Sequence, residues 1–187
     1  ETAGETVGYG GDPIEIGEAT AASGGSTTFS YRWKKGSTVI GGATSRTYDP
    51  PSGITTGGVF IREVDDSGTP DCASWTASTG SWTVTVQGAS VGGTAGTSTT
   101  ICTGSTANLT LTGETGTIQW EQSPNGSSSW TNVSGGSGAT TDSYTSATLT
   151  ATTYFRVAVT NGSSPTAYSN TITITVDENP TASAAGS

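Results

Sequence analysis

Carboxylates are the first residues to consider, because two of them at the right separation can act as the acid and the base of glycoside hydrolysis. The closest groupings are Glu15 with Glu18, and Asp65, Asp66 and Asp71. Both groups are interpreted as solvated loop charge. The three aspartates could alternatively hold Ca²⁺, a hard cation that takes several carboxylate and carbonyl oxygens. We therefore expect no catalytic residue and no cofactor, with Ca²⁺ at the three aspartates as the alternative.

Other common catalytic arrangements are excluded by composition. The sequence contains no histidine, so neither a Ser-His-Asp nor a Cys-His arrangement can be built. Its two cysteines cannot complete a usual zinc ligand set. No phosphate-binding loop of the G-x-x-x-x-G-K-[S/T] form occurs, and the 28 glycines favour turns. These observations predict a protein that is not an enzyme.

The aromatic residues fall into two groups. Trp33 and Trp120 each lie in a strand-like stretch soon after a Gly-rich turn, and we expect both in the core, together with Phe155 and Val157. The second group contains three candidate glycan contacts: Trp75, Trp130 and Tyr168. Trp75 and Trp130 lie in Ser-rich, loop-like sequence. All three would have to share one exposed face in order to stack on sugar rings.

The elements that position these residues belong to an internal repeat. Trp33 matches Trp120, Tyr48 matches Tyr144, and residues 60–62 match 154–156 at a similar spacing. The repeat predicts two domains, residues 1–88 and 89–178, followed by a linker at 179–187 to a further repeat.

Alternation of apolar residues with threonine marks the last strand of each copy, at 82–86 and 171–176. Gly and β-branched residues interrupt every candidate helix. Each copy also carries a large aromatic residue at a position that resembles the core Trp of immunoglobulin-like sandwiches. The sequence therefore predicts an all-β fold of two tandem immunoglobulin-like antiparallel β-sandwich repeats. If residues 60–62 match 154–156, Glu63 falls on the inward face, which predicts a bulge in that strand.

Charge and hydropathy limit the partners. The formal charge of −9 and the pI of about 4.1 disfavour nucleic acid and anionic lipid. No stretch approaches the roughly 20 apolar residues that span a bilayer, so we expect no direct membrane insertion. The first residues lack the basic and apolar regions of a signal peptide, which indicates a mature segment or an excised fragment.

Several segments, taken in order, resemble the repeats of giant gliding-motility adhesins of Bacteroidota. These segments are Gly10-Gly11-Asp12-Pro13, Tyr31-Arg32-Trp33, residues 42–50, residues 60–64, residues 100–105 and Tyr154-Phe155-Arg156-Val157. The resemblance implies type 9 secretion, display as an extracellular filament on the cell surface, and roles in attachment, gliding or cell-cell adhesion. Implied partners are neighbouring repeats of the same chain, surface polysaccharide, other cells, and copies that associate laterally.

The cysteines depart from that family's pattern. In similar repeats, a first-strand Cys pairs with one after the strand corresponding to residues 60–64. Here one copy keeps only Cys72 and the other only Cys102. If both copies fold alike, the two thiols lie about one domain length apart, beyond the roughly 7 Å between Cα atoms that a disulfide spans. Free thiols and an intermolecular bond are the alternatives.

Three functions are compatible with these features. The first is a structural and adhesive filament repeat that acts through length and weak multivalent contacts. The second is a carbohydrate-binding module that uses the exposed aromatics. The third is an accessory domain of a secreted enzyme.

Overall fold

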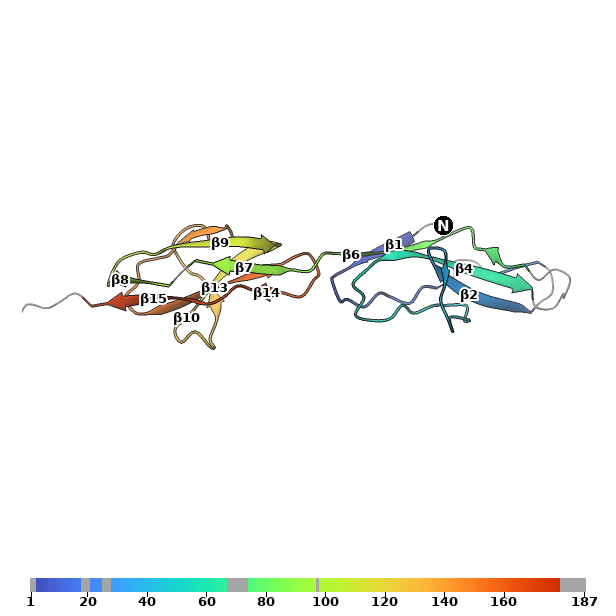
Figure 1. Cartoon of the computed structure of the whole chain (residues 1–187), viewed down its shortest axis with the longest axis horizontal. Coiled ribbons are helices and arrows are strands. Elements are labelled where there is room, and N and C mark those ends of the chain that lie inside the picture. The colour runs from blue at the N-terminus through green and yellow to red at the C-terminus, as the bar shows by residue number, and fades with distance from the viewer. Residues whose placement is uncertain (1–2, 18–20, 25–27, 67–73, 97, 179–187) are drawn as a thin grey trace, which may run out of the picture. The chain divides into compact units, whose positions relative to one another are not determined.

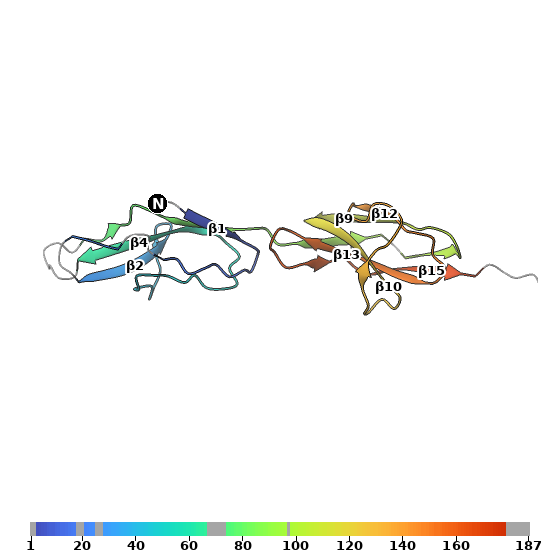
Figure 2. The same ribbon diagram turned by 180° about the vertical axis from the view of Figure 1, so that it is seen from behind.

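The computed structural model describes residues 3–17, 21–24, 28–66, 74–96 and 98–178, and their regular secondary structure is entirely β. The prediction of an all-β fold is confirmed. The chain forms two compact units, residues 1–88 (unit 1) and 89–187 (unit 2), drawn in Figure 1 and from behind in Figure 2. None of the described residues belongs to a helix long and apolar enough to cross a membrane.

Unit 1 is built on one sheet, in the order β1-β6-β4-β2-β3, with β5 also paired to β4. The strands are β1 (Ala3–Val7), β2 (Phe29–Lys35), β3 (Thr38–Val39), β4 (Gly58–Asp66), β5 (Thr76–Ala77) and β6 (Trp82–Val86). Its second layer has no regular strand among the described residues. Isolated bridges hold that layer instead, joining Ile16 to Tyr48 and Gly11 to Ile54.

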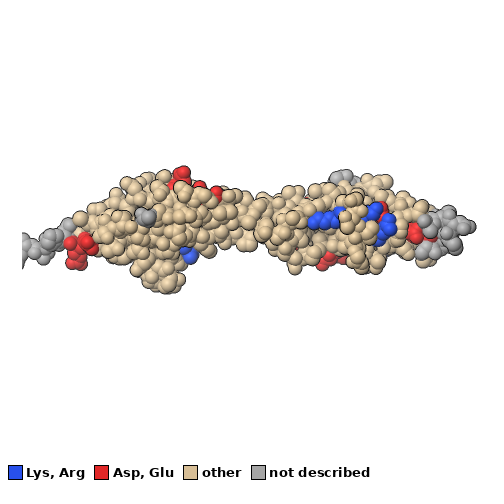
Figure 3. Space-filling model, viewed as in Figure 1, with Lys and Arg blue, Asp and Glu red and all other residues tan. Residues whose placement is uncertain are grey.

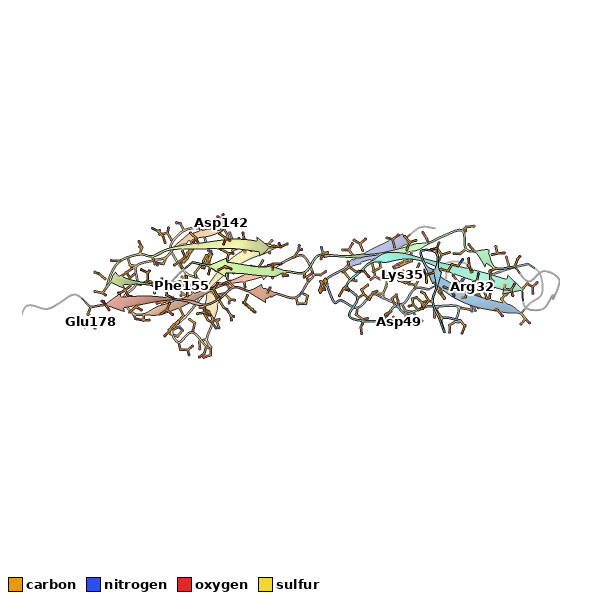
Figure 4. The ribbon with its side chains drawn as sticks, in the orientation of Figure 1. Arg32, Lys35, Asp49, Asp142, Phe155 and Glu178 are labelled. Atoms are coloured by element: carbon orange, nitrogen blue, oxygen red, sulfur yellow. The ribbon has the colours of Figure 1, made fainter. Side chains whose placement is uncertain are left out.

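Unit 2 has two hydrogen-bonded layers. One sheet has the order β11-β10-β13-β15-β8, with β14 also paired to β13, and the other has the order β12-β9-β7. The strands are β7 (Val91–Ala95), β8 (Thr99–Cys102), β9 (Asn108–Thr115), β10 (Thr117–Ser123), β11 (Thr131–Asn132), β12 (Ser143–Thr145), β13 (Thr153–Thr160), β14 (Ala167–Tyr168) and β15 (Ile172–Asp177). Phe155 lies between the two layers (Figure 4).

An aromatic trio fills the centre of each unit. In unit 2, Tyr144 has its ring centroid 6.0 Å from that of Trp120 and 6.2 Å from that of Phe155. Trp33, Tyr48 and Phe60 form the corresponding trio in unit 1, at 5.8 and 5.7 Å. The two indole N–H groups also match, because each donates to a backbone carbonyl three residues before the tyrosine, that of Ser45 or of Thr141. Each buried indole therefore has its one polar group satisfied.

The strand register corrects one sequence prediction. Trp33 lies opposite Arg62, whereas Trp120 lies opposite Val157. Phe60 is therefore the counterpart of Phe155, one residue away from the match inferred from the sequence. Strands β2 and β4 pair over seven consecutive residues, so the predicted bulge is absent from this pairing and Glu63 lies on the outer face. The outer face is favourable because Arg32 and Lys34 of β2 share it.

The first and last strands of unit 1 pair in parallel, as do β8 and β15 of unit 2. Strand β1 is in register with β6 from Ala3 opposite Trp82 to Val7 opposite Val86. Strand β8 is in register with β15 over four residue pairs. The remaining ladders of both units are antiparallel in the part of the chain that the structure describes.

Candidate functional site

The carboxylates considered for catalysis do not assemble into an acid-base pair among the described residues. Glu15 accepts a hydrogen bond from the Thr47 hydroxyl at 2.6 Å, and Glu18 lies outside the described residues. Of the calcium candidates, Asp65 and Asp66 end strand β4, and Asp71 lies outside the described residues. The described part of the chain holds no group of three side chains of metal-ligating type. The calcium hypothesis stays a prediction.

The cysteines are placed only in part. Cys102 is exposed at the end of β8 and has no disulfide partner in the described ranges. Cys72 lies outside those ranges.

An open groove of about 410 Å³ runs along one side of unit 2. Its walls come from residues 122–124, 131, 134 and 147–153, and they carry hydroxyl, amide and apolar groups. No ionisable side chain lines it. A groove of this kind offers no general acid or base, so its chemistry is limited to hydrogen bonding.

The most distinctive cluster lies on the outer face of the larger sheet of unit 2. The Arg156 guanidinium lies 4.3 Å from the centroid of the Trp130 ring and 3.9 Å from that of Tyr168. Its Nε also donates to Glu121 Oε2 at 2.7 Å. We call these four side chains the aromatic platform. It combines two rings, a cation and an anion on one sheet face, an arrangement that can both stack and hydrogen-bond.

The order of the strands explains why these side chains meet. Trp120 and Phe155 point into the core, so Glu121 and Arg156, each one residue further along its strand, point outward. Tyr168 lies directly opposite Ala158, which shares the outer face with Arg156. Trp130 comes from the other side of β13, because it precedes β11, the neighbour of β10. The two rings thus reach the guanidinium from opposite sides of its strand.

The loop that carries Trp130 is fixed from within. Ser123 is 1% exposed, and its hydroxyl donates to the Ser128 carbonyl at 2.6 Å. The same hydroxyl accepts from the backbone N–H groups of Asn125 and Gly126. The Asn125 side chain in turn accepts from the N–H groups of Ser127 and Ser128. These side-chain hydrogen bonds to the loop's own backbone hold its conformation in place of a β-ladder, as Asx and Ser/Thr turns do.

Tyr168 is held by the residues that follow it. The Ser169 hydroxyl accepts from Val157 N–H at 2.9 Å. The Asn170 amide accepts from Ala95 N–H at 2.8 Å and donates to the Ala95 carbonyl at 3.3 Å, which joins this segment to β7. Both rings of the platform are therefore mounted on hydrogen-bonded backbone.

Unit 1 carries a simpler cluster on its outer face. Arg32 lies 4.3 Å from the Trp75 ring centroid and donates to Glu63 at 2.5 Å. Lys34 donates to the other Glu63 oxygen at 2.7 Å. Figure 4 labels Arg32 on strand β2. The hydrogen bond from Lys34, with further contributions from Arg32, lowers the pKa of the Glu63 carboxyl below its ordinary value despite its burial.

We expect unit 1 to lose stability in acid through Glu63. Because the pKa of Glu63 is lower in the folded state, its contribution is present above the unfolded pKa and is lost as pH falls through the folded value. The substitution Glu63→Gln should cost about 1 kcal/mol at pH 7 and should flatten the loss of stability between pH 6 and 3. Thermal unfolding across this range would measure it. Equal pH dependence in both proteins would contradict the prediction.

The sequence candidates are thus distributed over separate places. Trp130 and Tyr168 share the aromatic platform, whereas Trp75 belongs to the cluster of unit 1. Trp33, Trp120, Phe155 and Val157 are buried, at 3% exposure or less. Sequence reasoning missed Arg156 and Glu121 as site residues. The sequence nevertheless contained a feature that singles out Arg156. It is the only Lys or Arg after residue 88, and it occupies an outward position of its strand.

Comparisons with known proteins bear on the fold. A family model for a domain of unknown function (DUF8696) matches residues 91–178, and no curated protein sequence matches the chain significantly. A solved fragment of titin domains A168–A170 is 17% identical with a TM-score of 0.56, over 92% of this chain and 61% of that chain. The I-band fragment I67–I69 from titin is 10% identical with a TM-score of 0.53, over 94% and 63%.

The chain spans about three fifths of the length of those two fragments. At such low identity the likeness shows the fold alone. The sequence prediction of the fold class is confirmed: the chain is a tandem pair of immunoglobulin-like β-sandwich repeats.

Proposed function

We propose that this chain is a non-catalytic repeat segment of a long extracellular adhesin or surface filament. The observation that carries the proposal is the parallel pairing of β1 with β6 and of β8 with β15. In unit 2 the first strand, β7, pairs with β9, and the parallel pair β8–β15 begins with the next strand along the chain. Tension on a filament reaches unit 1 directly through its first and last strands, β1 and β6. When these strands are parallel, opposite ends of the pair are pulled in opposite directions, so the ladder is loaded along its length and its hydrogen bonds share the load.

The wider setting belongs to the same proposal. The resemblance to gliding-motility adhesins supports export by type 9 secretion in a member of the Bacteroidota, display on the cell surface, and a role in attachment, gliding or cell-cell adhesion. Imaging the intact protein on cells tests this setting. A thin surface fibre is the expected result, and a compact secreted enzyme would contradict it.

The force-bearing role predicts an effect of removing one backbone donor from β1. Ala3 N–H donates to the Ser81 carbonyl and Gln87 N–H to the Val7 carbonyl, so alternate residues of β1, including Glu5, face β6. Proline at position 5 removes such a donor. A lost hydrogen bond of about 1 kcal/mol should speed unfolding of unit 1 about fivefold under single-molecule tension.

Two variants separate the backbone effect from the side chain. Glu5→Ala removes the carboxylate that accepts from Ile14 N–H but keeps the backbone donor. Thr6→Pro removes an N–H that faces away from β6, where an edge strand tolerates proline. Only Glu5→Pro should show the full acceleration. If Thr6→Pro or Glu5→Ala unfolds as fast as Glu5→Pro, the parallel ladder does not carry the load.

A second candidate function, a carbohydrate-binding or accessory module of a secreted enzyme, is favoured by one observation. The aromatic platform gathers two of the three aromatic residues that the sequence indicated as glycan contacts on one face of unit 2. The two functions are compatible, because a filament that attaches to polysaccharide needs such a surface.

A further inference from the structure

We propose that the aromatic platform of unit 2 binds a neutral polysaccharide. One pyranose ring of the polysaccharide would stack on the face of Tyr168 that points away from Arg156, and neighbouring sugar units would contact Trp130 and bond to Arg156 and Glu121 through their hydroxyl groups. The inference rests on the proposed adhesive function, for which it names the ligand class and the site.

The ring surfaces on the platform are accessible. Tyr168 is 50% exposed although its ring contacts Arg156, and Trp130 is half-buried. An exposed ring held by a rigid backbone offers apolar area at little cost in side-chain entropy. The C–H face of a pyranose is flat and apolar, so it matches such a ring. Two accessible aromatic rings on one sheet face indicate a binding site more strongly than a single exposed apolar residue would.

The polar groups on the platform suit hydroxyls. Within the pair, Arg156 Nε donates to Glu121 Oε2. The two terminal nitrogens of Arg156 and the second oxygen of Glu121 have no hydrogen-bond partner among the residues that the structure describes. A donor pair beside an acceptor complements two neighbouring hydroxyls, each of which both donates and accepts.

The charge balance selects a neutral ligand. Glu121 compensates Arg156, which is the only basic residue after residue 88. The other described charges of unit 2 are acidic: Glu114, Asp142, Asp177 and Glu178. Figure 3 shows correspondingly little basic surface on the face of unit 2 that it presents. An acidic polysaccharide would be repelled by the unit's net charge, whereas a neutral one would not.

Unit 1 has no equivalent platform in its described part. Arg32 contacts one ring, Trp75, and both oxygens of Glu63 are already bonded, one to Arg32 and one to Lys34. The acceptor that a sugar hydroxyl would need is therefore occupied. This difference makes Trp75 a matched control, because it is also a partly exposed tryptophan stacked on an arginine.

The test is titration of the intact chain with soluble probes. The neutral probes are hexasaccharides of β-1,4-glucose, β-1,3-glucose and β-1,4-mannose, and the acidic probe is oligogalacturonate. We expect saturable binding of at least one neutral probe. Trp130→Ala and Tyr168→Ala should each weaken it about tenfold, whereas Trp75→Ala should leave it within twofold. Tyr168→Phe keeps the ring and should retain most of the affinity.

Three results would overturn the inference: no neutral probe binds, oligogalacturonate binds more tightly than every neutral probe, or Trp75→Ala weakens binding as much as Trp130→Ala. Amide circular dichroism would confirm that each variant is folded. Single-molecule unfolding of Tyr168→Ala should match the unmodified chain. If no glycan binds but the mechanical behaviour is as predicted, the ligand proposal is wrong and the proposed filament role stands.

Discussion

Replacing Trp120 with alanine is expected to bring unit 2 close to unfolding. The Trp120 side chain is fully buried, it packs against Tyr144, and its indole N–H donates to the Thr141 carbonyl at 2.9 Å. Truncation removes the apolar contacts and leaves a cavity. It also leaves the Thr141 carbonyl without its hydrogen-bond donor. Losses of this kind cost about 3–5 kcal/mol, a large part of the free energy of unfolding of a small domain.

Hydrogen exchange followed by mass spectrometry would measure this effect unit by unit. Amides of residues 98–178 should lose protection in Trp120→Ala, while those of β2, β4 and β6 in unit 1 should keep it. Trp130→Ala is the matched control, because it deletes a tryptophan of the same unit that packs on the surface. Equal protection in the two variants would show that the aromatic trio is not the centre of the core.

Period-two alternation made most of the fold predictable. Threonine alternates with Ile172, Ile174 and Val176, and the first two of these apolar residues are buried in β15 as expected. The repeat placed a tryptophan at the centre of each core, and both are buried. These features are local, since a strand's inward face follows from its own sequence.

The register of β4 was not predictable in the same way. Phe60 and Ile61 are adjacent large apolar residues, as are Tyr154 and Phe155, so the two copies can be aligned in two frames one residue apart. A shift of one residue exchanges the two faces of a strand. The burial of Phe60 and the ion pairs of Glu63 with Arg32 and Lys34 decide the frame, and both depend on strands distant in sequence.

The candidate site was predictable only in part. Partial exposure of Trp130 follows from its Ser-rich, loop-like surroundings in the sequence, but the convergence of Trp130 and Tyr168 on Arg156 does not. The two rings are far apart along the chain and meet because β10, β13 and β14 are neighbours in one sheet. Strand order is a property of the whole unit, and a single sequence does not specify it.

The position of Tyr168 also depends on a glycine in the facing layer. An added Cβ at Gly92 would lie 2.1 Å from the Tyr168 carbonyl oxygen, and the neighbouring atoms are also backbone. Backbone cannot rotate away as a side chain can, so β7 or β14 would have to move. The bonds from Asn170 to Ala95 hold the two segments together nearby and oppose that movement.

Gly92→Ala is therefore expected to destabilise unit 2 by about 1–3 kcal/mol, as overpacking does, and to displace Tyr168 from Arg156. Denaturant unfolding would give the change in free energy. Gly96→Ala is the matched control, because the one tight contact of its Cβ would be with the Thr110 hydroxyl, at 3.1 Å, and that side chain can rotate, while the Thr110 backbone lies at ordinary contact distance. If the two variants are equally stable, the close approach of β7 to β14 does not position the platform. If Gly92→Ala alone is destabilised and also loses affinity for the neutral hexasaccharide, packing between the layers and the binding face are physically coupled.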